Sequence, residues 1–463
     1  MGHAGAGATH ASAGTLKMFN ETRGGARSPF TMTKMNHSRR SFLRVLGAAG
    51  AGAPILARAE RLEAALPPRP DHLGFEAASP ASVRRLRDSY FLSPDLIYLN
   101  HASIGTVPRP VHEAHAGYLE LCETHPSLYV WGGVWREVTE DTRAAAARLL
   151  NCRSDDLAIT HNTTEGFSIL AQGLDLDSGD EVLFSSLNHA GAAVAWDELA
   201  PRRGFTVRRF EFPLERAPDL TVDEVVALHV DAIRPETRVL IIPHVDNMIG
   251  MTHPIREIAL AARDRGVEFV FVDGAQSAGM ISVDLSVAGV DAYAMSGHKW
   301  LQSPKGLGLF WASERLQAVV PRMWFKTGGD RVDMTARKYE DYSTRAWPAV
   351  VAFGDALAFQ ASIGAQEKER RYRALWTLVH GRTTADARLH WGSPVDPALR
   401  SVIMAVGVRG RTAPELGPML LERHGAVLRA FGGRLNTLRI SPNLMTEDQE
   451  LERFLDVLTS NSS

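Results

Sequence analysis

Cysteine is scarce in this sequence: only Cys122 and Cys152 occur among 463 residues. Two cysteines exclude a disulfide framework and a zinc site built from cysteine ligands, and they leave open a single disulfide between them. A dominant charge is also missing, because 51 Lys and Arg residues nearly balance 53 Asp and Glu residues. No block of Lys and Arg interleaved with aromatic residues occurs, so nothing indicates a nucleic-acid partner.

Long hydrophobic runs are absent as well. The apolar stretch 45–56 is well short of the ~20 residues that a membrane-spanning helix needs, so we expect no permanent membrane anchor. Arg39 and Arg40 precede this stretch, and residues 57–59 (Ala-Arg-Ala) follow it as an A-x-A cleavage site, in the order of a twin-arginine export signal cleaved near Ala59. We therefore expect a periplasmic or exported protein. A basic, Ala-rich terminal helix is the alternative, and the protein would then be cytoplasmic.

The sequence before this signal is rich in Gly, Ala, Ser and Thr and shows no periodicity. We expect residues 1–59 to comprise a disordered N-terminus and the signal, with the true start at Met1 or Met35. Residues 60–95 contain a cluster of prolines and are predicted to be a linker with a short helix.

From residue 96, short apolar runs alternate with amphipathic stretches. This alternation is typical of an α/β fold with a largely parallel sheet and helices on both faces. The predicted strands are 157–160, 181–185, 206–211, 239–243, 268–273, 291–295 and 307–311, and the predicted helices are 164–173, 190–200, 222–232 and 254–265. We expect a large domain over 96–345 with a mainly parallel seven-stranded sheet, and ligands of such sheets bind at the carboxyl ends of the strands.

After residue 345 the pattern changes. A long helical pattern over 348–378 is followed by short strands near 400–406, 426–430 and 435–440, and by a final amphipathic helix at 446–458. These features predict a smaller C-terminal α+β domain over 346–463.

Two of the predicted strands end in residues that carry chemistry. The apolar run 268–273 ends in Asp273, and a buried carboxylate is costly unless a cation meets it. The strand 291–295 leads into Ser296, His298 and Lys299. A lysine among apolar and aromatic residues can lose its hydration, which lowers its pKa and frees the amine to attack a carbonyl. A helix cap at Asp273 and a solvated surface charge at Lys299 are the alternatives.

Together, Asp273 and Lys299 predict pyridoxal 5′-phosphate (PLP) as cofactor. PLP needs an amine that bonds to its aldehyde carbon and a carboxylate that keeps its ring nitrogen protonated, so that the ring withdraws electrons from the substrate Cα. The spacing leaves room for one helix and one strand between the two strand ends. The hydrogen-bond donors of Ser296 and His298 suit a phosphate.

Residues 273–276 (Asp-Gly-Ala-Gln) and 296–299 (Ser-Gly-His-Lys) resemble the class V aminotransferase family of fold-type I PLP-dependent transferases. The resemblance extends from about residue 96 to residue 458. Residues 100–103 and 343–345 favour its isopenicillin N epimerase-like branch. The implied catalytic residues are Lys299, Asp273 and His189, where a helix cap is the alternative for His189.

The resemblance also implies the residues that hold the cofactor. Thr163 and Thr164 would bind the phosphate at a helix N-terminus, which is a natural anion site. The other implied contacts are Ser296 and His298 near the phosphate, His189 on the ring face, Gln276 at the phenolic oxygen, Asn247 near both cofactor and substrate, and Asp273 and Lys299.

Two further positions extend the implied site. Arg439 would clamp the substrate carboxylate through two hydrogen bonds, with an ordinary salt bridge as the alternative. Thr344 would reach the phosphate of a neighbouring subunit's cofactor, which implies a homodimer with shared active sites. Ser343 replaces the glycine usual at its position.

The implied activity is that of an enzyme acting at the Cα of an amino acid, as an aminotransferase or an epimerase. A C–S lyase that performs β-elimination on a cysteine derivative is the alternative enzyme, and a non-catalytic PLP-fold binding protein is the alternative of another class. A persulfide-forming desulfurase is not expected, because residues 408–416, where its reactive loop would lie, contain no cysteine.

Overall fold

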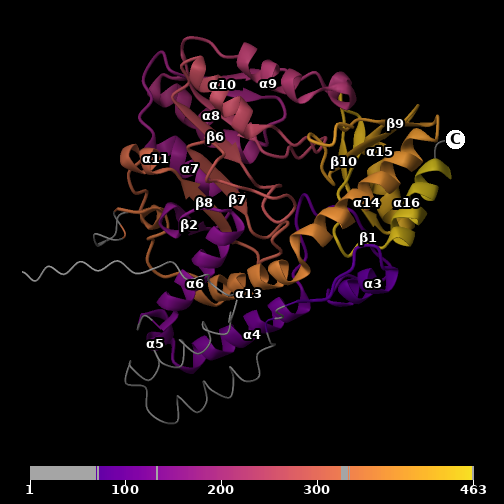
Figure 1. Ribbon diagram of the computed structural model, residues 1–463, viewed down its shortest axis with the longest axis horizontal. Coiled ribbons are helices and arrows are strands. Elements are labelled where there is room, and N and C mark those ends of the chain that lie inside the picture. Colours follow the sequence, from indigo (N-terminus) through magenta and orange to yellow (C-terminus); the bar gives the residue numbers. More distant parts are fainter. Residues whose placement is uncertain (1–68, 70–71, 132–133, 325–331, 333, 461–463) are drawn as a thin grey trace, which may run out of the picture. The chain divides into compact units, whose positions relative to one another are not determined.

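The computed structural model describes residues 69, 72–131, 134–324, 332 and 334–460 (Figure 1). The expected export signal, its cleavage site near Ala59 and both candidate start residues lie outside this part of the chain. Before the first strand, the short helix expected in the linker is present as α3 (Pro80–Asp88).

A mainly parallel sheet of seven strands forms the centre of the fold, as predicted. Its strands are β2 (Leu157–Thr160), β3 (Glu181–Ser185), β4 (Thr206–Phe210), β5 (Thr237–Pro243), β6 (Phe269–Asp273), β7 (Ala292–Ser296) and β8 (Gly308–Ala312). They lie in the order β2-β8-β7-β6-β5-β3-β4, and only β8 runs antiparallel to its neighbours. The carboxyl ends of β5, β6 and β7 therefore meet at one edge.

Both faces of this sheet are buried, because alternate side chains of its strands enter two different hydrophobic clusters. Val270 and Val272 of β6 belong to one cluster, whereas Phe269 and Phe271 belong to the other. The predicted helices are present as α7 (Thr163–Gly173), α8 (Ala190–Arg203), α9 (Val222–Asp231) and α10 (Ile255–Asp264). Helices α7 and α8 pack on the face with Phe271, and α10 packs on the other.

The connection between β6 and β7 differs from the expectation. Residues 274–291 contain turns and no helix. The chain turns sharply at Gly274, where a Cβ atom would lie 1.9 Å from the Tyr293 ring. The strand ends that carry Asp273 and Lys299 are nonetheless adjacent, since β6 and β7 pair in parallel.

Four more helices of the described chain are α4 (Arg109–Thr124), α5 (Pro126–Val130), α6 (Val134–Leu149) and α11 (Glu314–Val319). Helices α6 and α11 pack against the large sheet, whereas α4 and α5 pack against neighbouring helices. The long helix expected over 348–378 is two helices, α13 (Trp347–Ile363) and α14 (Ala365–Thr384). They bend by 76° at Gly364, whose φ of 87° is open to glycine but strained for other residues. Helix α13 is buried against α4 and α6.

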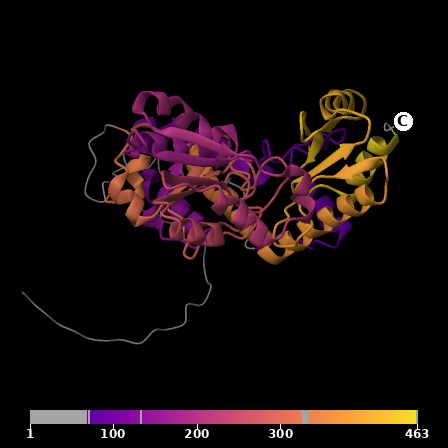
Figure 2. The ribbon, with the colours of Figure 1, turned by 90° about the horizontal axis from the view of Figure 1, so that it is seen from above.

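The C-terminal part contains an antiparallel sheet in the order β12-β13-β10-β9. Its strands are β9 (Leu389–Trp391), β10 (Met404–Val408), β12 (Arg429–Phe431) and β13 (Thr437–Ile440), and its helices are α15 (Ala413–His424) and α16 (Asp448–Ser460). Strand β1 (Ile97–Tyr98) pairs in parallel with β11 (Ala426–Val427), so the indigo segment runs beside the yellow one in Figure 2. The predicted domain boundaries at residues 95 and 345 stay predictions.

Two smaller findings complete the fold. Cys122 and Cys152 are free thiols and form no disulfide with each other. Among the described residues, no single helix has the length and apolar composition of a membrane span, and only the bent pair α13 and α14, taken together, reaches them.

Candidate active site

The carboxyl ends of β5, β6 and β7 and the N-termini of α7 and α8 surround a cavity of about 530 Å³. All but one of the predicted site residues line it. These are Thr163, Thr164, His189, Asn247, Asp273, Gln276, Ser296, His298, Lys299 and Arg439. The large seven-stranded sheet and the four-stranded C-terminal sheet thus bring together residues that lie up to 276 positions apart in the sequence.

An acid and an amine face this cavity from adjacent strands. Asp273 is the last residue of β6, and Lys299 lies three residues beyond the end of β7. Burial raises the pKa of Asp273, while the N–H of Ala275, at 2.9 Å from Oδ1, and the charges of Lys299 and His189 act in the opposite sense. Burial lowers the pKa of Lys299 to about 8, against the opposing charge of Asp273. Its amine is therefore partly neutral near physiological pH and can act as a nucleophile.

His189 both caps a helix and lines the cavity. It is the N-cap residue of α8, and its Nδ1 accepts a hydrogen bond from the N–H of Gly191 at 3.0 Å. Burial lowers the pKa of the ring, so the imidazole is neutral at pH 7 with its proton at Nε2. The cap fixes the ring at the cavity wall.

The start of α7 supplies an anion site. Asn162 is the N-cap residue, and its side chain accepts the N–H of Glu165 at 3.0 Å. The hydroxyls of Thr163 and Ser296 lie 2.8 Å apart and bring β7 against the helix start. Helix N–H groups and hydroxyls together suit a phosphate.

His298 adds a buried polar atom to this anion site. Its Nδ1 has no hydrogen-bond partner within the part of the chain that the structure describes. Burial, with help from Lys299 and Lys305, lowers its pKa to about 4. A buried nitrogen without a partner is costly, and an acceptor bound in the cavity would satisfy it.

Gln276 is held in one orientation at the cavity wall. Its Oε1 accepts the indole N–H of Trp300 and its Nε2 donates to the carbonyl oxygen of Ala102, both at 2.8 Å. Because an amide carries two N–H hydrogens, one remains available to an acceptor in the cavity.

Arg439 is a buried cation that forms no ion pair within the described part of the chain. Its side chain is 2% exposed, and it donates to the carbonyl oxygen of Asn247 at 2.9 Å, to Oδ1 of Asn100 at 2.8 Å and to Oγ of Ser103. These acceptors are neutral, and no carboxylate of the described chain pairs with it. This environment favours a role in carboxylate binding, which stays a prediction. Burial and Arg429 lower its pKa to about 10 against the opposing charge of Asp246, and a bound carboxylate would offset the cost of burying this charge.

Sequence reasoning missed Arg429 and Phe431, which also line the cavity. Both belong to β12, where Arg429 lies opposite Arg439 of β13. The guanidinium of Arg439 lies 5.8 Å from the centre of the Phe431 ring. Alternation in β12 puts Arg429 and Phe431 on one face, but only the pairing with β13 shows that this face meets the cavity.

Thr344 is the predicted residue that the structure does not bring to the cavity; its side chain is exposed. A contact with the cofactor of another subunit requires that subunit, so its role stays a prediction. The preceding Ser343 has φ 80°, the left-handed region that favours glycine. This backbone explains why glycine is usual there.

The residues of the cavity fit PLP. The α7 start, the two hydroxyls and the unpartnered His298 nitrogen form the phosphate end, and the buried pair Asp273 and Lys299 has the two side-chain types that the ring and aldehyde need.

Comparison with known proteins agrees with this geometry. The family model described as Aminotransferase class-V matches residues 97–454. An isopenicillin N epimerase of Streptomyces clavuligerus is 31% identical over 408 residues, which are 82% of this chain and 98% of that protein. A cysteine desulfurase of Salmonella agona is 31% identical over 79% of this chain and 93% of that protein.

Solved structures share the fold. A mutant of C-DES with glycine covalently linked to its PLP cofactor superposes with a TM-score of 0.72 at 23% identity, covering 80% of this chain and 98% of that one. At this identity the match supports a fold-type I architecture for the chain.

Proposed function

The chain belongs to the aminotransferase class-V family and takes PLP as its cofactor, and from this premise we propose that it acts on the Cα–H bond of an α-amino acid, as an aminotransferase or an epimerase. The observation that carries the proposal is the cavity that is lined both by the buried pair Asp273 and Lys299 and by the buried guanidinium of Arg439. Such a cavity suits an amino acid, because one end meets the amino group of the substrate and the other end meets its carboxylate.

The roles of the residues follow from their contacts. Thr163, Thr164, Ser296 and His298 would hold the phosphate, and Asp273, Gln276 and His189 would hold the ring. When bound, PLP supplies an electron-withdrawing ring that acidifies the Cα–H bond of the substrate.

The remaining steps belong to Lys299 and Arg439. The amine of Lys299, with its lowered pKa, accepts the Cα proton, and epimerisation then requires that a proton reach the opposite face of Cα. Arg439 orients the substrate through its carboxylate, held in turn by Asn100, Ser103 and Asn247.

The relatives name two outcomes for the same first step. The similarity to isopenicillin N epimerases supports proton return to Cα, and the similarity to cysteine desulfurases supports β-elimination from a cysteine derivative as the second candidate. A desulfurase that stores sulfur as a persulfide needs a thiol at the site. Neither Cys122 nor Cys152 lines the cavity, so we propose no persulfide step.

Proton NMR in D₂O separates these outcomes. The holoenzyme is incubated with single L-amino acids and with S-substituted cysteines, with and without a 2-oxo acid. Loss of the Cα–H signal reports proton removal. Accumulation of the D-enantiomer identifies an epimerase, a new 2-oxo acid an aminotransferase, and pyruvate with a free thiol a C–S lyase. Absence of Cα–H exchange with every amino acid would contradict the proposed function.

The variant Lys299→Ala tests the central residue. We expect it to lose the yellow colour of the covalently held cofactor and all Cα–H exchange, because no other amine of the described chain lines the cavity. Lys338→Ala is the control, since its amine donates to the carbonyl oxygen of Gln317 at 2.5 Å, outside the cavity. Exchange at the wild-type rate in Lys299→Ala would remove this lysine from the mechanism.

We also propose a homodimer and export. Thr344 would complete the partner's site, and light scattering after size-exclusion chromatography would detect the dimer. A twin-arginine signal would place the mature enzyme in the periplasm, so replacement of Arg39 and Arg40 by lysines should retain the protein in the cytoplasmic fraction. Equal distribution of both forms between the fractions would contradict export by this route.

A further inference from the structure

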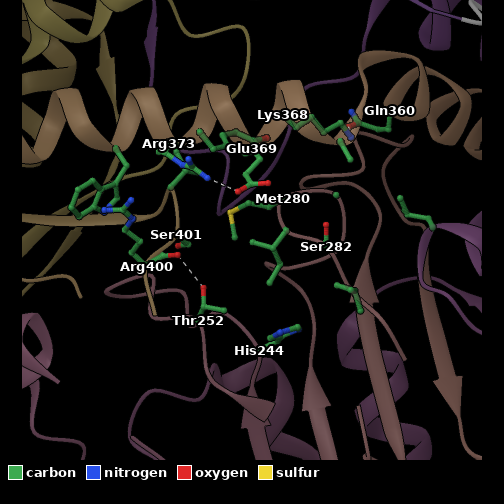
Figure 3. Close-up of a pocket in the computed structure, with 18 of the residues that line it drawn as sticks. His244, Thr252, Met280, Ser282, Gln360, Lys368, Glu369, Arg373, Arg400 and Ser401 are labelled. Carbon is green, nitrogen blue, oxygen red and sulfur yellow. Dashed lines mark hydrogen bonds and ion pairs between the residues drawn. The ribbon is translucent and has the colours of Figure 1, made fainter. Parts of the chain in front are cut away.

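A second, larger cavity of about 1030 Å³ lies against the bend between α13 and α14 (Figure 3). Its walls come from the end of α13, from α14, from residues 279–283 after β6 and from residues 397–402 before β10. It shares no lining residue with the catalytic cavity. Its volume is in the range of sites for small organic molecules.

The walls of this hinge cavity carry an excess of positive charge. Arg148, Lys368, Arg373 and Arg400 line it, and Glu369 is the acidic residue among its lining residues. Glu369 pairs with Arg373 at 2.5 Å. The guanidinium of Arg400 lies 4.1 Å from the Trp376 ring centre, with no ion pair in the described part of the chain.

Lys368 is the most buried of these cations, with 9% exposure. Its amine donates to Oε1 of Gln360 at 2.7 Å, across the break at Gly364, and Figure 3 shows the two side chains together on the helices at the cavity edge. A neutral amide does not compensate an ammonium charge. Burial accordingly lowers the pKa of Lys368 to about 7, and a carboxylate bound nearby would stabilise the charged form.

Large apolar and aromatic side chains form another part of the wall. Met280, Tyr372 and Trp376 are buried and line the cavity, and Figure 3 shows Met280 projecting toward its middle. An inorganic anion would leave this surface in contact with water, whereas a molecule with an apolar body would cover it.

We propose that the hinge cavity binds an organic carboxylate with an apolar body. The carboxylate faces the basic side chains, Lys368 foremost, and the body lies along Tyr372 and Trp376. Such a ligand contacts both α13 and α14 and the loops from both sheets. The site is independent of the amino acid bound in the catalytic cavity.

Isothermal titration calorimetry of the holoenzyme tests this site with three probes. Decanoate carries both a charge and an apolar chain, decanol only the chain, and inorganic phosphate only a charge. We expect decanoate to bind at one site per chain and about tenfold or more tighter than either other probe, since a charge-assisted hydrogen bond and apolar burial act together. No saturable decanoate binding, or equal binding of phosphate, would overturn the proposal.

Variants locate the bound decanoate. Lys368→Met keeps the volume of the side chain and should weaken decanoate binding about tenfold, with Arg400→Gln as a second variant. Arg370→Gln is the matched control on α14, because Arg370 is exposed, pairs with Glu367 and does not line the cavity. Unchanged affinity in both Lys368→Met and Arg400→Gln would refute the site.

Arg439→Ala distinguishes the two cavities. This variant should bind decanoate as the wild type does, because Arg439 lines only the catalytic cavity. Loss of decanoate binding in Arg439→Ala would mean that the carboxylate occupies the substrate site, and the proposal would fail while the proposed function stood.

Discussion

At the scale of single residues, the proposed chemistry depends on how far burial lowers the pKa of Lys299. Its pKa falls from 10.5 to about 8. Only the neutral amine bonds to the PLP aldehyde, so the rate of covalent cofactor attachment to apoenzyme should rise with pH and level off above about 8. Stopped-flow absorbance across the neutral and alkaline range measures this rate. A midpoint at the ordinary lysine value would show that the cavity does not desolvate the amine.

Arg439 is the second residue with a measurable consequence. Arg439→Ala removes a charge-assisted pair with the substrate carboxylate worth about 1.5–3 kcal/mol, so KM for the amino acid should rise on the order of ten- to a hundredfold. Arg434→Ala is the control, since Arg434 is exposed and only meets Glu211 and Glu215 at 3.4 Å. Steady-state kinetics with one amino acid measure KM for both variants. An unchanged KM in Arg439→Ala would show that Arg439 does not bind the substrate carboxylate.

Which site residues the sequence can predict depends on how local their signal is. Asp273 and Lys299 each follow an apolar strand, and the start of α7 is marked by Asn162, so their positions at a sheet edge follow from the strand pattern. Arg429 and Phe431 carry no such signal. Their approach to the cavity depends on the pairing of β12 with β13, which a single sequence does not encode in any short motif.

At the scale of elements, the strand pattern was the most predictable feature. All seven strands of the large sheet were predicted because each is a short apolar run between turns. Helices α4 and α6 were missed, since they pack around α13 and lie outside the strand–helix alternation. The bend at Gly364 was missed as well, because an isolated glycine is tolerated within a helical pattern and does not by itself mark the end of a helix.

Gly364 and Gly381 test the bend as a matched pair. Gly364→Ala should lower the free energy of unfolding by about 1–3 kcal/mol, because its φ of 87° and ψ of 133° strain a residue with a Cβ. Gly381→Ala, within α14, should raise it by about 0.5–1 kcal/mol, since a Cβ there meets no atom within 4 Å. Urea denaturation followed by circular dichroism measures both. Shifts of the same sign would show that the bend does not depend on the glycine.

At the scale of the whole molecule, the phosphate end of the catalytic cavity predicts that the stability of the fold depends on the cofactor. Without a phosphate, the buried Nδ1 of His298 lacks a hydrogen-bond acceptor or donor in the described part of the chain. A ligand present at a thousand times its Kd stabilises the fold by about 4 kcal/mol. We expect removal of PLP to lower the unfolding temperature in calorimetry and its return to restore it. Equal unfolding temperatures of the apoenzyme and holoenzyme would contradict this expectation.

The sequence was less informative at this scale. The change of pattern after residue 345 indicated a second α+β region, and the antiparallel sheet β12-β13-β10-β9 lies there. It did not indicate that β1, before the large sheet, pairs with β11 inside that region. Such a contact joins segments far apart in the chain, and each segment on its own looks like a short extended run.

The contacts of Asn100 and Ser103 with Arg439 have a consequence for the order of events during folding. The backbone of Asn100 also bridges to Ser441, so the two walls of the carboxylate site come from segments that lie 339 positions apart in the chain. Asp273 and Lys299, in contrast, follow two strands that pair directly with each other. Closing the longer loop costs more chain entropy, so the receptor for the substrate carboxylate should form later than the pair that meets the cofactor.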